Sequence, residues 1–347
     1  MKAFQGELEL IEQIRRAAES AGSNTGRKRA GVVLGIGDDC AILQPPRGHE
    51  VLVTTDFTLE GRHFRRDWHP AESVGHRALA RGLSDLAAMG ARPLAAFLSL
   101  ALPKEMVATQ TGRRWVQRFF TGLQTLAIEH GVPLAGGDTS ESPSNLVLAD
   151  IVLTGSAPAR RALRRSGGRP GDCLYVTGTL GGAAAELDEM AERAAKVRSR
   201  AQRNPRTASE TAEHPQLFPQ PRLQVGLALL RRRFATAAID LSDGLSTDLA
   251  HLCRESRVGA EISAAALPIH PLASRAGAAR GLVLALNGGE DYELLFSAPP
   301  SVRMPRTIAR VPITQVGKLM RGNQILIVDS SGNRQPLKPS GWEHFAR

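Results

Sequence analysis

Residues 236–249 read TAAIDLSDGLSTDL and combine a strand, a turn and the start of a helix. The TAAID run is typical of a buried strand, and the Ser and Asp residues of the turn can cap a helix that begins near Leu245. Asp240 then ends the strand, where loops form binding sites in α/β proteins. A plain strand-to-helix cap has the same pattern. The stretch therefore predicts an α/β architecture with acidic residues at a strand end.

The rest of the chain alternates strands and helices in two series. In the first series, we expect strands at 32–36, 51–56, 93–102 and 146–155, and helices at 71–89 and 111–130. In the second, we expect helices at 181–196, 222–233 and 245–255, and strands at 172–178, 236–240, 259–263, 282–286, 291–298, 313–318 and 325–329. A chain of 347 residues is long for one core. We therefore expect two domains, 1–156 and 157–347.

Seven acidic residues lie in short turn-like motifs, although the net charge of the chain is +10. They are Asp38 and Asp39 in GIGDDCA, Asp56 in TTDF, Asp85 in LSDLAAMGA, Asp138 in GGDTS, and Asp240 with Asp243 in DLSDGLS. Each one alone is a common turn or cap residue. Magnesium, however, is usually held by carboxylates together with substrate phosphates. Their joint occurrence favours a magnesium and phosphate site, the kind of site that in-line phosphoryl transfer needs.

The helix expected at 71–89 places Asp85 near its C-terminal end, where the helix dipole disfavours a carboxylate. This mildly favours a ligand role over an exposed ion pair with Arg81, one turn earlier.

Two glycine-rich segments, GGD at 136–138 and TGTLGG at 177–182, can bring backbone N–H groups close to an anion. Neither matches the P-loop or the glycine motif of protein kinases, so both of those classes are disfavoured.

The positive charge is concentrated in two segments, 160–169 and 193–206. The second has six basic residues, no acidic residue and no interleaved aromatic residue, which favours a solvated insertion over a nucleic-acid site. We expect a flexible basic loop at about 195–221, inside the second domain, and no nucleic-acid partner.

The sequence has no run of about 18 apolar residues, and it begins with a charged amphipathic helix rather than a signal peptide. We therefore expect a cytoplasmic protein without a membrane partner.

The three cysteines, Cys40, Cys173 and Cys253, are far apart in the sequence and show no paired spacing, so neither zinc nor a disulfide framework is indicated.

Seven motifs, taken in order, resemble the thiamine-monophosphate kinase family of the aminoimidazole ribonucleotide synthetase-like superfamily. They are GIGDDCAIL, TTDFTLEGRHF, LSDLAAMGARP, GGDTS, RRSGGRPGDCLYVTGTLGG, AAIDLSDGLSTDL and NGGEDYELLF. The resemblance implies a two-domain α/β (α+β) fold, with an N-terminal mixed sheet and helices and a C-terminal α/β domain, in a homodimer formed through the N-terminal sheets. It also implies ATP-dependent phosphorylation of thiamine monophosphate to thiamine diphosphate by direct transfer, with several magnesium ions.

The same resemblance assigns roles to residues that match the family motifs. The implied metal-binding set is Asp39, Thr54, Thr55, Asp56, Asp85, Asp138, Asp240 and Asp243, of which Asp56, Asp85 and Asp243 are the expected catalytic residues. The implied ATP contacts are Gly137, Asp138, Arg165 and Ser242. The implied substrate contacts are His63, Glu290 and Trp342. Taken without the resemblance, a lone His or Trp is more often structural. The chain departs from the family at Gly82, where Asn is common.

Two alternatives remain open at the level of the sequence. One is another ATP-using member of the superfamily, similar to selenophosphate or aminoimidazole ribonucleotide synthetase. The first cysteine, Cys40, lies inside GDDC without a preceding glycine-rich loop, which argues against selenophosphate synthesis. The other alternative is a non-catalytic nucleotide-binding homologue, but all seven acidic residues are present.

Overall fold

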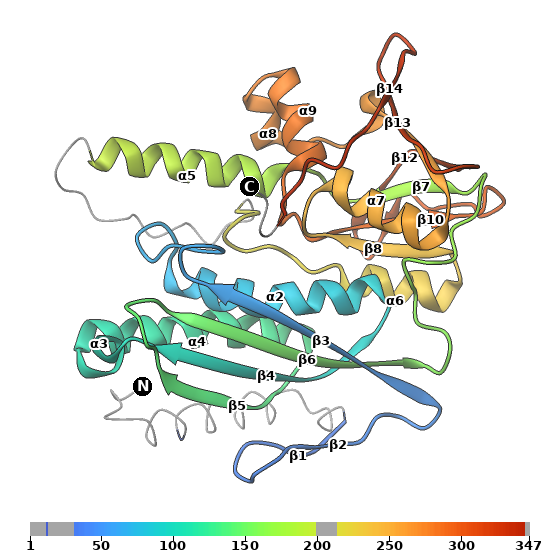
Figure 1. Ribbon diagram of the computed structural model, residues 1–347. Helices are drawn as coiled ribbons and strands as arrows, with labels where there is room; N and C mark the ends of the chain where they lie inside the picture. The colour runs from blue at the N-terminus through green and yellow to red at the C-terminus, as the bar shows by residue number, and fades with distance from the viewer. Residues whose placement is uncertain (1–11, 13–30, 199–213, 344–347) are drawn as a thin grey trace. The chain divides into compact units, whose positions relative to one another are not determined.

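The computed structural model describes residue 12 and residues 31–198 and 214–343 (Figure 1). Among these, two compact units form: unit 1 contains residues 12, 31–83 and 92–160, and unit 2 contains residues 84–91, 161–198 and 214–343. The domain bounds expected from the sequence stay a prediction. Most of the expected amphipathic N-terminal helix and positions 199–213 of the expected basic loop lie outside the described residues.

Unit 1 is built on a mixed sheet in the order β3-β6-β4-β5. Its strands are β3 (His49–Leu59), β6 (Leu148–Pro158), β4 (Arg92–Leu102) and β5 (Leu134–Glu141). β6 is antiparallel to both neighbours, whereas β4 and β5 are parallel. The helices α2 (Ala71–Ala88) and α4 (Gln110–His130) lie on one face, and the short α3 (Lys104–Ala108) connects β4 to α4. The hairpin β1 (Val32–Leu34) and β2 (Ile42–Leu43) packs on the other through Val32 and Leu43.

The two long helices of unit 1 approach each other at paired glycines. A Cβ at Gly75 of α2 would lie 1.9 Å from the carbonyl oxygen of Phe119, and a Cβ at Gly122 of α4 would lie 1.9 Å from that of Glu72. No real Cβ tolerates such contacts, so both positions require glycine for the backbones to meet. The helical spacing of apolar residues predicted both helices, and the structure confirms them.

Unit 2 contains a larger sheet in the order β14-β13-β9-β12-β7-β10-β8, with β11 paired to β12. The strands are β7 (Cys173–Thr177), β8 (Ala237–Leu241), β9 (Gly259–Ser263), β10 (Glu293–Ala298), β11 (Thr307–Ile308), β12 (Val311–Met320), β13 (Ile325–Val328) and β14 (Arg334–Pro336). The helices are α5 (Gly182–Arg198), α6 (Leu223–Arg232), α7 (Leu245–Ser256), α8 (Pro271–Arg275) and α9 (Ala278–Asn287), with the 3-10 turn η1 (Ala264–Ala266). The expected two-domain α/β fold with a mixed N-terminal sheet is therefore confirmed.

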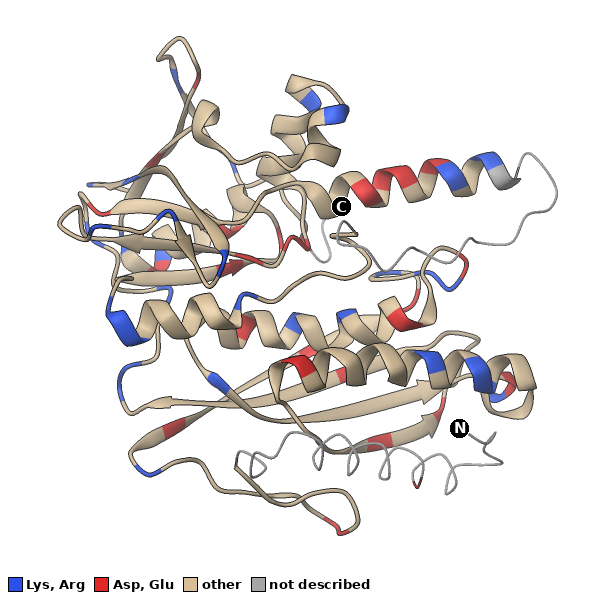
Figure 2. Ribbon diagram, turned by 180° about the vertical axis from the view of Figure 1, so that it is seen from behind, with Lys and Arg blue, Asp and Glu red and all other residues tan. Residues whose placement is uncertain are grey.

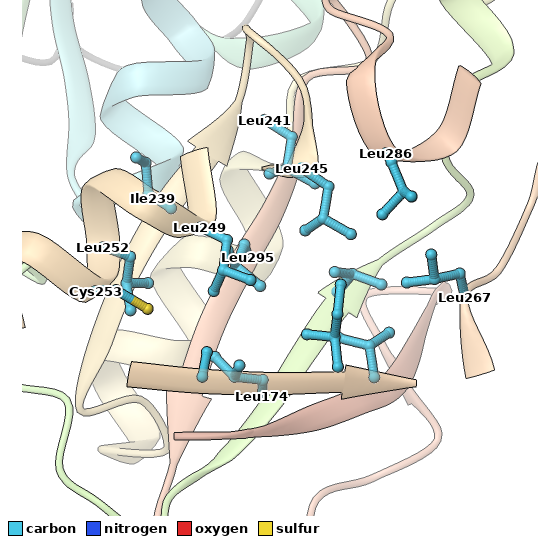
Figure 3. Close-up of a cluster of buried hydrophobic side chains, with 14 of the residues drawn as sticks. Leu174, Ile239, Leu241, Leu245, Leu249, Leu252, Cys253, Leu267, Leu286 and Leu295 are labelled. Atoms are coloured by element: carbon cyan, nitrogen blue, oxygen red, sulfur yellow. The ribbon is translucent and has the colours of Figure 1, made fainter. Parts of the chain in front are cut away.

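The core of unit 2 lies between this sheet and α7. One face of α7 carries the buried leucines Leu245, Leu249 and Leu252 (Figure 3). These side chains pack with Leu174 of β7 and Leu295 of β10. All five side chains are buried. Their burial fixes α7 against the sheet, and with it the loop that precedes the helix.

The prediction of a strand at 282–286 is wrong, because LVLAL lies inside helix α9. A five-residue apolar run does not distinguish a buried strand from the buried side of a helix. Leu284 and Ala285 are buried while Val283 is 45% exposed, which is the period of a helix. The start of the expected basic loop also shifts, since α5 continues to Arg198.

Helix α5 separates its charges along its axis. Its acidic residues lie toward the beginning and its basic residues toward the end, as Figure 2 shows. This order complements the helix dipole.

Within the described part of the chain, no helix combines the length and the apolar character needed to cross a membrane.

We expect Gly122→Ala to lower the free energy of unfolding by about 1–3 kcal/mol, because the new methyl group collides with the backbone of α2. Urea unfolding followed by circular dichroism measures this. Thr125→Ala, on the exposed side of the same helix, is the matched control and should change stability by less than about 1 kcal/mol. Equal stability of Gly122→Ala and the wild-type protein would contradict the close approach.

Candidate functional site

The loop between β8 and α7 is held by a buried carboxylate. Asp248 Oδ2 accepts hydrogen bonds from the backbone N–H groups of Ser242 and Asp243, each at 3.1 Å. Burial, followed by the nearby charge of Asp243, raises the pKa of Asp248 to about 7. Asp248 was not among the residues predicted from the sequence; its position in the first turn of α7, after Gly244, is the signal for such a capping role. The loop therefore presents Ser242 and Asp243 in a fixed conformation.

The segment before β10 docks on this same loop. Glu290 N–H donates to the carbonyl oxygen of Ser242 at 2.8 Å, and Tyr292 N–H donates to that of Leu241 at 2.9 Å. Glu290 and Tyr292 both have left-handed backbone conformations, with φ of 67° and 50°. Such conformations cost free energy in residues other than glycine and cluster at functional sites. The carboxyl end of β8 thus brings Glu290 beside Ser242.

The C-terminal segment packs on the other side of the turn. Trp342 N–H donates to the carbonyl oxygen of Asp243 at 2.9 Å, and Gly341 N–H donates to Thr247 Oγ1 at 3.1 Å. A Cβ at position 341 would lie 1.9 Å from the same Asp243 oxygen, so the close approach requires glycine. Trp342 is 49% exposed, which leaves much of its ring accessible to a ligand.

Three further candidates of unit 2, Asp240, Asp85 and Arg165, belong to β8 or lie near it. Ser84 Oγ donates to Asp240 Oδ2 at 2.8 Å, which links β8 to the turn of α2 that carries Asp85. Arg165 accepts a hydrogen bond from Ser256 Oγ at its carbonyl oxygen, at 2.7 Å. Its positive charge also acts on Asp248, in the direction that lowers the pKa. Unit 2 therefore brings together seven of the candidates, which are Asp85, Arg165, Asp240, Ser242, Asp243, Glu290 and Trp342.

In unit 1, the TTD triplet lies on strand β3. Asp56 is half-buried, and its Oδ1 lies 3.7 Å from Nε of Arg81 on α2. Thr55 is exposed on the opposite face, where its Oγ1 donates to Asp150 Oδ1 at 2.8 Å. Thr54 points toward α2, since a Cβ at Gly82 would lie 3.5 Å from its methyl group. The three candidate ligands thus divide between the two faces of the sheet.

Other candidates of unit 1 lie in the turn between β1 and β2 and within strand β5. Asp39 is exposed beside Asp38, whose Oδ1 accepts from Asp39 N–H at 2.8 Å. Asp138 is exposed on β5, opposite Ser99 of β4. Gly137 before it has φ of 147°, and a Cβ there would lie 1.9 Å from the Leu98 carbonyl oxygen. Both the conformation and the space at position 137 therefore require glycine.

His63 has a defined orientation in the turn after β3. Its Nδ1 accepts from Leu59 N–H at 3.0 Å, so any ring proton of the neutral form lies on Nε2. The neighbouring Glu60 accepts from Arg66 Nε at 2.6 Å and from Val147 N–H at 2.9 Å. Within the EGRHF motif, Glu60 therefore holds the turn that presents His63.

The expected anion cradle at 177–182 already has an anionic partner from the chain itself. Asp291 Oδ2 accepts from Gly181 N–H at 2.6 Å, and its Oδ1 accepts from Ala183 N–H at 3.1 Å. Asp291 thereby caps the first turn of α5. Burial raises the pKa of this carboxyl to about 7, although the two N–H groups act in the opposite direction. The interpretation of TGTLGG as a phosphate site is therefore corrected: its N–H groups serve a helix cap.

A second acidic residue of the GGEDYEL motif is also structural. Glu293 is 3% exposed and accepts from Thr177 Oγ1 at 2.6 Å and from Arg222 Nε at 2.7 Å. Arg222 Nη2 donates to the other oxygen of the same carboxylate. This two-point pairing fixes the segment before α6 to β10.

The donor set suits a hard cation. Within residues 31–198 and 214–343, no three His, Cys, Asp or Glu side chains form a ready-made metal group. The candidates are oxygen donors, chiefly carboxylates, and magnesium typically takes one or two carboxylates and completes its shell with water and phosphate oxygens. The residues present therefore fit magnesium that arrives with a phosphate ligand better than a preformed zinc-type site.

Comparison with known families matches both parts of the chain. The AIR synthase related protein N-terminal domain matches residues 37–157, and the AIR synthase related protein C-terminal domain matches residues 169–304. Among curated proteins, thiamine-monophosphate kinase of Escherichia coli is 39% identical over 323 residues, which cover 92% of this chain and 94% of that protein. The enzyme of Haemophilus influenzae is 34% identical, with 83% of each chain covered.

Solved structures give the same result. Thiamine-monophosphate kinase from Stenotrophomonas maltophilia has a TM-score of 0.76 at 34% identity, covering 95% of this chain and 98% of that one. AaThiL complexed with AMPPCP and TMP has a TM-score of 0.70 at 28% identity, covering 98% of this chain and 97% of that one.

The Asp291 cap predicts a pH effect on stability. The pKa of Asp291 is about 7 in the folded protein, above the ordinary 3.8 of an aspartate, so the folded state binds the proton more tightly than the unfolded chain. The contribution of Asp291 to stability therefore falls as pH rises from about 4 to about 7. Asp291→Asn lacks this titration, so its stability relative to the wild-type protein should improve between pH 5 and pH 7. Urea unfolding midpoints at both values measure the difference; a constant or opposite difference would contradict the elevated pKa.

Proposed function

Because this chain belongs to the thiamine-monophosphate kinase family, we propose that it transfers the γ-phosphoryl group of ATP to thiamine monophosphate, giving thiamine diphosphate and ADP. The observation that carries the site assignment is the loop at the end of β8. Its backbone joins the candidate metal residue Asp243 to the candidate substrate residues Glu290 and Trp342. AMPPCP, an ATP analogue, and TMP are bound in the AaThiL structure.

The proposed reaction needs no strong base. The attacking group is a phosphate oxygen of thiamine monophosphate, and a phosphate monoester is largely deprotonated at neutral pH because its second pKa is about 6. That oxygen forms a bond to the γ-phosphorus as the bond to the ADP oxygen breaks. The main barrier is the approach of two anionic groups, so catalysis is chiefly positioning and charge neutralisation.

The acidic candidates alone would repel phosphates. Magnesium, when bound, supplies the positive charge that neutralises the transferring group. We assign Asp39, Thr54, Thr55, Asp56, Asp85, Asp138, Asp240 and Asp243 as the residues that would hold several magnesium ions, with Thr55 contributing through its main chain because its side chain lies on the outward face of β3 and pairs with Asp150. Asp56, Asp85 and Asp243 are the members on which turnover should depend most.

Remaining candidates contact the two substrates in the proposal. Arg165 offers a planar fork to an ATP phosphate, and Gly137, Asp138 and Ser242 complete the ATP contacts. His63 presents a donor through Nε2 in its neutral form, and Glu290 presents a carboxylate to thiamine monophosphate. Trp342 offers its ring to a flat or cationic part of the same substrate. A cytoplasmic location is part of the proposal because the reaction consumes ATP.

The proposal includes a homodimer formed through the sheet of unit 1. Strand β3 is an edge strand, and its outward face exposes Val51 by 47%, Val53 by 66% and Phe57 by 60%. Alternating apolar side chains on an open sheet face are typical of an interaction surface. A second copy of this chain is the proposed occupant.

The experiment that tests the activity is an assay of ADP release with ATP and magnesium, in which thiamine diphosphate is measured directly. Thiamine monophosphate, free thiamine and aminoimidazole-pathway substrates are compared. Product from the monophosphate alone is expected. ADP release with another substrate and without thiamine diphosphate would favour the other ATP-using members of the superfamily.

We expect Asp56→Asn and Asp85→Asn each to lower kcat by at least about 100-fold, because a neutral amide holds a metal ion poorly. Circular dichroism should show an unchanged fold. Asp188→Asn is the control, since Asp188 pairs with Arg280 at 2.7 Å on the surface; its activity should stay within about twofold. Full activity of either site variant at low magnesium would contradict the assignment.

We expect Val53→Arg to convert the dimer into a monomer, because it places a charge in the centre of the proposed apolar contact. Light scattering coupled to size-exclusion chromatography measures the mass. Ile128→Arg is the control, since Ile128 is 50% exposed but lies on α4. A wild-type monomer, or a Val53→Arg dimer of unchanged stability, would contradict this surface.

A further inference from the structure

Hydrogen bonds in unit 2 connect Glu290 to the neighbouring Asp291 by way of helix α5 and Gln216. Asp291, the next residue, caps α5 through Gly181 and Ala183. One turn into that helix, Glu186 Oε2 accepts from Gln216 N–H at 2.8 Å. Gln216 Nε2 then donates to Glu290 Oε2 at 2.9 Å. The series thus starts and ends at adjacent residues of the GGEDYEL motif.

Glu186 fixes Gln216 firmly. The Glu186 side chain is 8% exposed, and its second oxygen, Oε1, lies 2.6 Å from His214 Nδ1. Both of its oxygens are therefore used to hold the segment 214–216. Further along, the pairing of Arg222 with Glu293 ties the end of the same segment to β10. The position of Gln216 is thus set from both sides.

Gln216 has the properties of a residue that orients another. It is 2% exposed, so its amide is withdrawn from bulk water. The donor Nε2 fits a carboxylate, whereas the reverse orientation of the amide would place two acceptors together. The other amide atom, Oε1, is buried and accepts no hydrogen bond from the described residues. A buried acceptor without a donor is costly, which favours a role beyond packing.

We propose that Gln216 is a positioning residue that orients the Glu290 carboxylate for binding of thiamine monophosphate. This inference rests on the proposed function, in which Glu290 contacts that substrate. The Gln216 donor restricts the rotamers of the Glu290 carboxylate before the substrate binds, so its removal adds an ordering cost to binding. The loss therefore falls on binding of thiamine monophosphate and spares ATP.

Gln216→Met tests this proposal, because it keeps the length and approximate volume of the side chain and removes the donor. We expect the KM for thiamine monophosphate to rise about tenfold, with kcat and the KM for ATP within about threefold. Gln220→Met is the matched control: Gln220 is an exposed residue of the same segment, and its KM values should not change. Unchanged KM for thiamine monophosphate in Gln216→Met would overturn the inference.

A double-mutant cycle with Glu290→Gln separates positioning from general stability. If Gln216 acts through Glu290, the double variant has the same KM for thiamine monophosphate as Glu290→Gln alone. If the KM for thiamine monophosphate of the double variant rises by the product of the two single increases, the proposal is overturned and Gln216 has an independent role. Should Gln216→Met unfold, Gln216→Asn, one methylene too short to reach Glu290, must show the same rise in KM or the proposal fails.

The outcome is distinct from failure of the proposed function. Wild-type protein that forms thiamine diphosphate, together with a Gln216→Met variant of normal KM, overturns only the role of Gln216. Wild-type protein that forms no thiamine diphosphate overturns the proposed function, and the role of Gln216 with it.

Discussion

The candidate site of unit 2 depends on the backbone hydrogen bonds at the carboxyl end of β8. Leu241 and Ser242 use their carbonyl oxygens to hold Tyr292 and Glu290, while Asp248 uses one carboxylate oxygen to hold Ser242 and Asp243. Backbone groups cannot be left unpaired when buried, so these contacts fix the turn in one conformation. The leucines of α7 pack against the sheet and hold the helix that follows this turn (Figure 3). The loop backbone that carries Asp243 is therefore held in place by the chain itself.

The acidic residues of the sequence motifs in unit 2 fall into two groups. Asp248, Asp291 and Glu293 accept hydrogen bonds from backbone or side-chain donors of the chain itself, and each is part of the scaffold. Asp240 and Asp243 lie between these scaffold residues, at the strand end and in the turn. The elevated pKa values of Asp248 and Asp291 follow from burial, which is the consequence of using carboxylates as internal caps. The raised pKa values of Asp248 and Asp291 therefore mark supports of the site.

Much of this arrangement was predictable from the sequence because its motifs are local. The strand, turn and helix at 236–249, the two long helices of unit 1 and the family membership were predicted and are confirmed. The strand at 282–286 was wrong, because a short apolar run has no period that separates helix from strand. The roles of Asp291 and Asp248 were missed, because a carboxylate in a turn looks the same whether it binds a cation or caps a helix.

The sequence by itself determined the fold class, because alternating apolar runs require buried strands and helices. It also determined the kind of ligands available, because aspartates beside glycines provide oxygen ligands for a cation that binds with phosphate. Only the tertiary structure decided which acidic residues, Asp248, Asp291 and Glu293 among them, serve the scaffold. It joined Gln216 to Glu290 and Glu186 to Gln216, pairs separated by many residues in the sequence. Such pairs are set by the packing of α5 against α8 and α9 and by the pairing of Arg222, before α6, with Glu293 of β10. No local pattern encodes them, because the physical constraint is the satisfaction of buried polar groups in three dimensions.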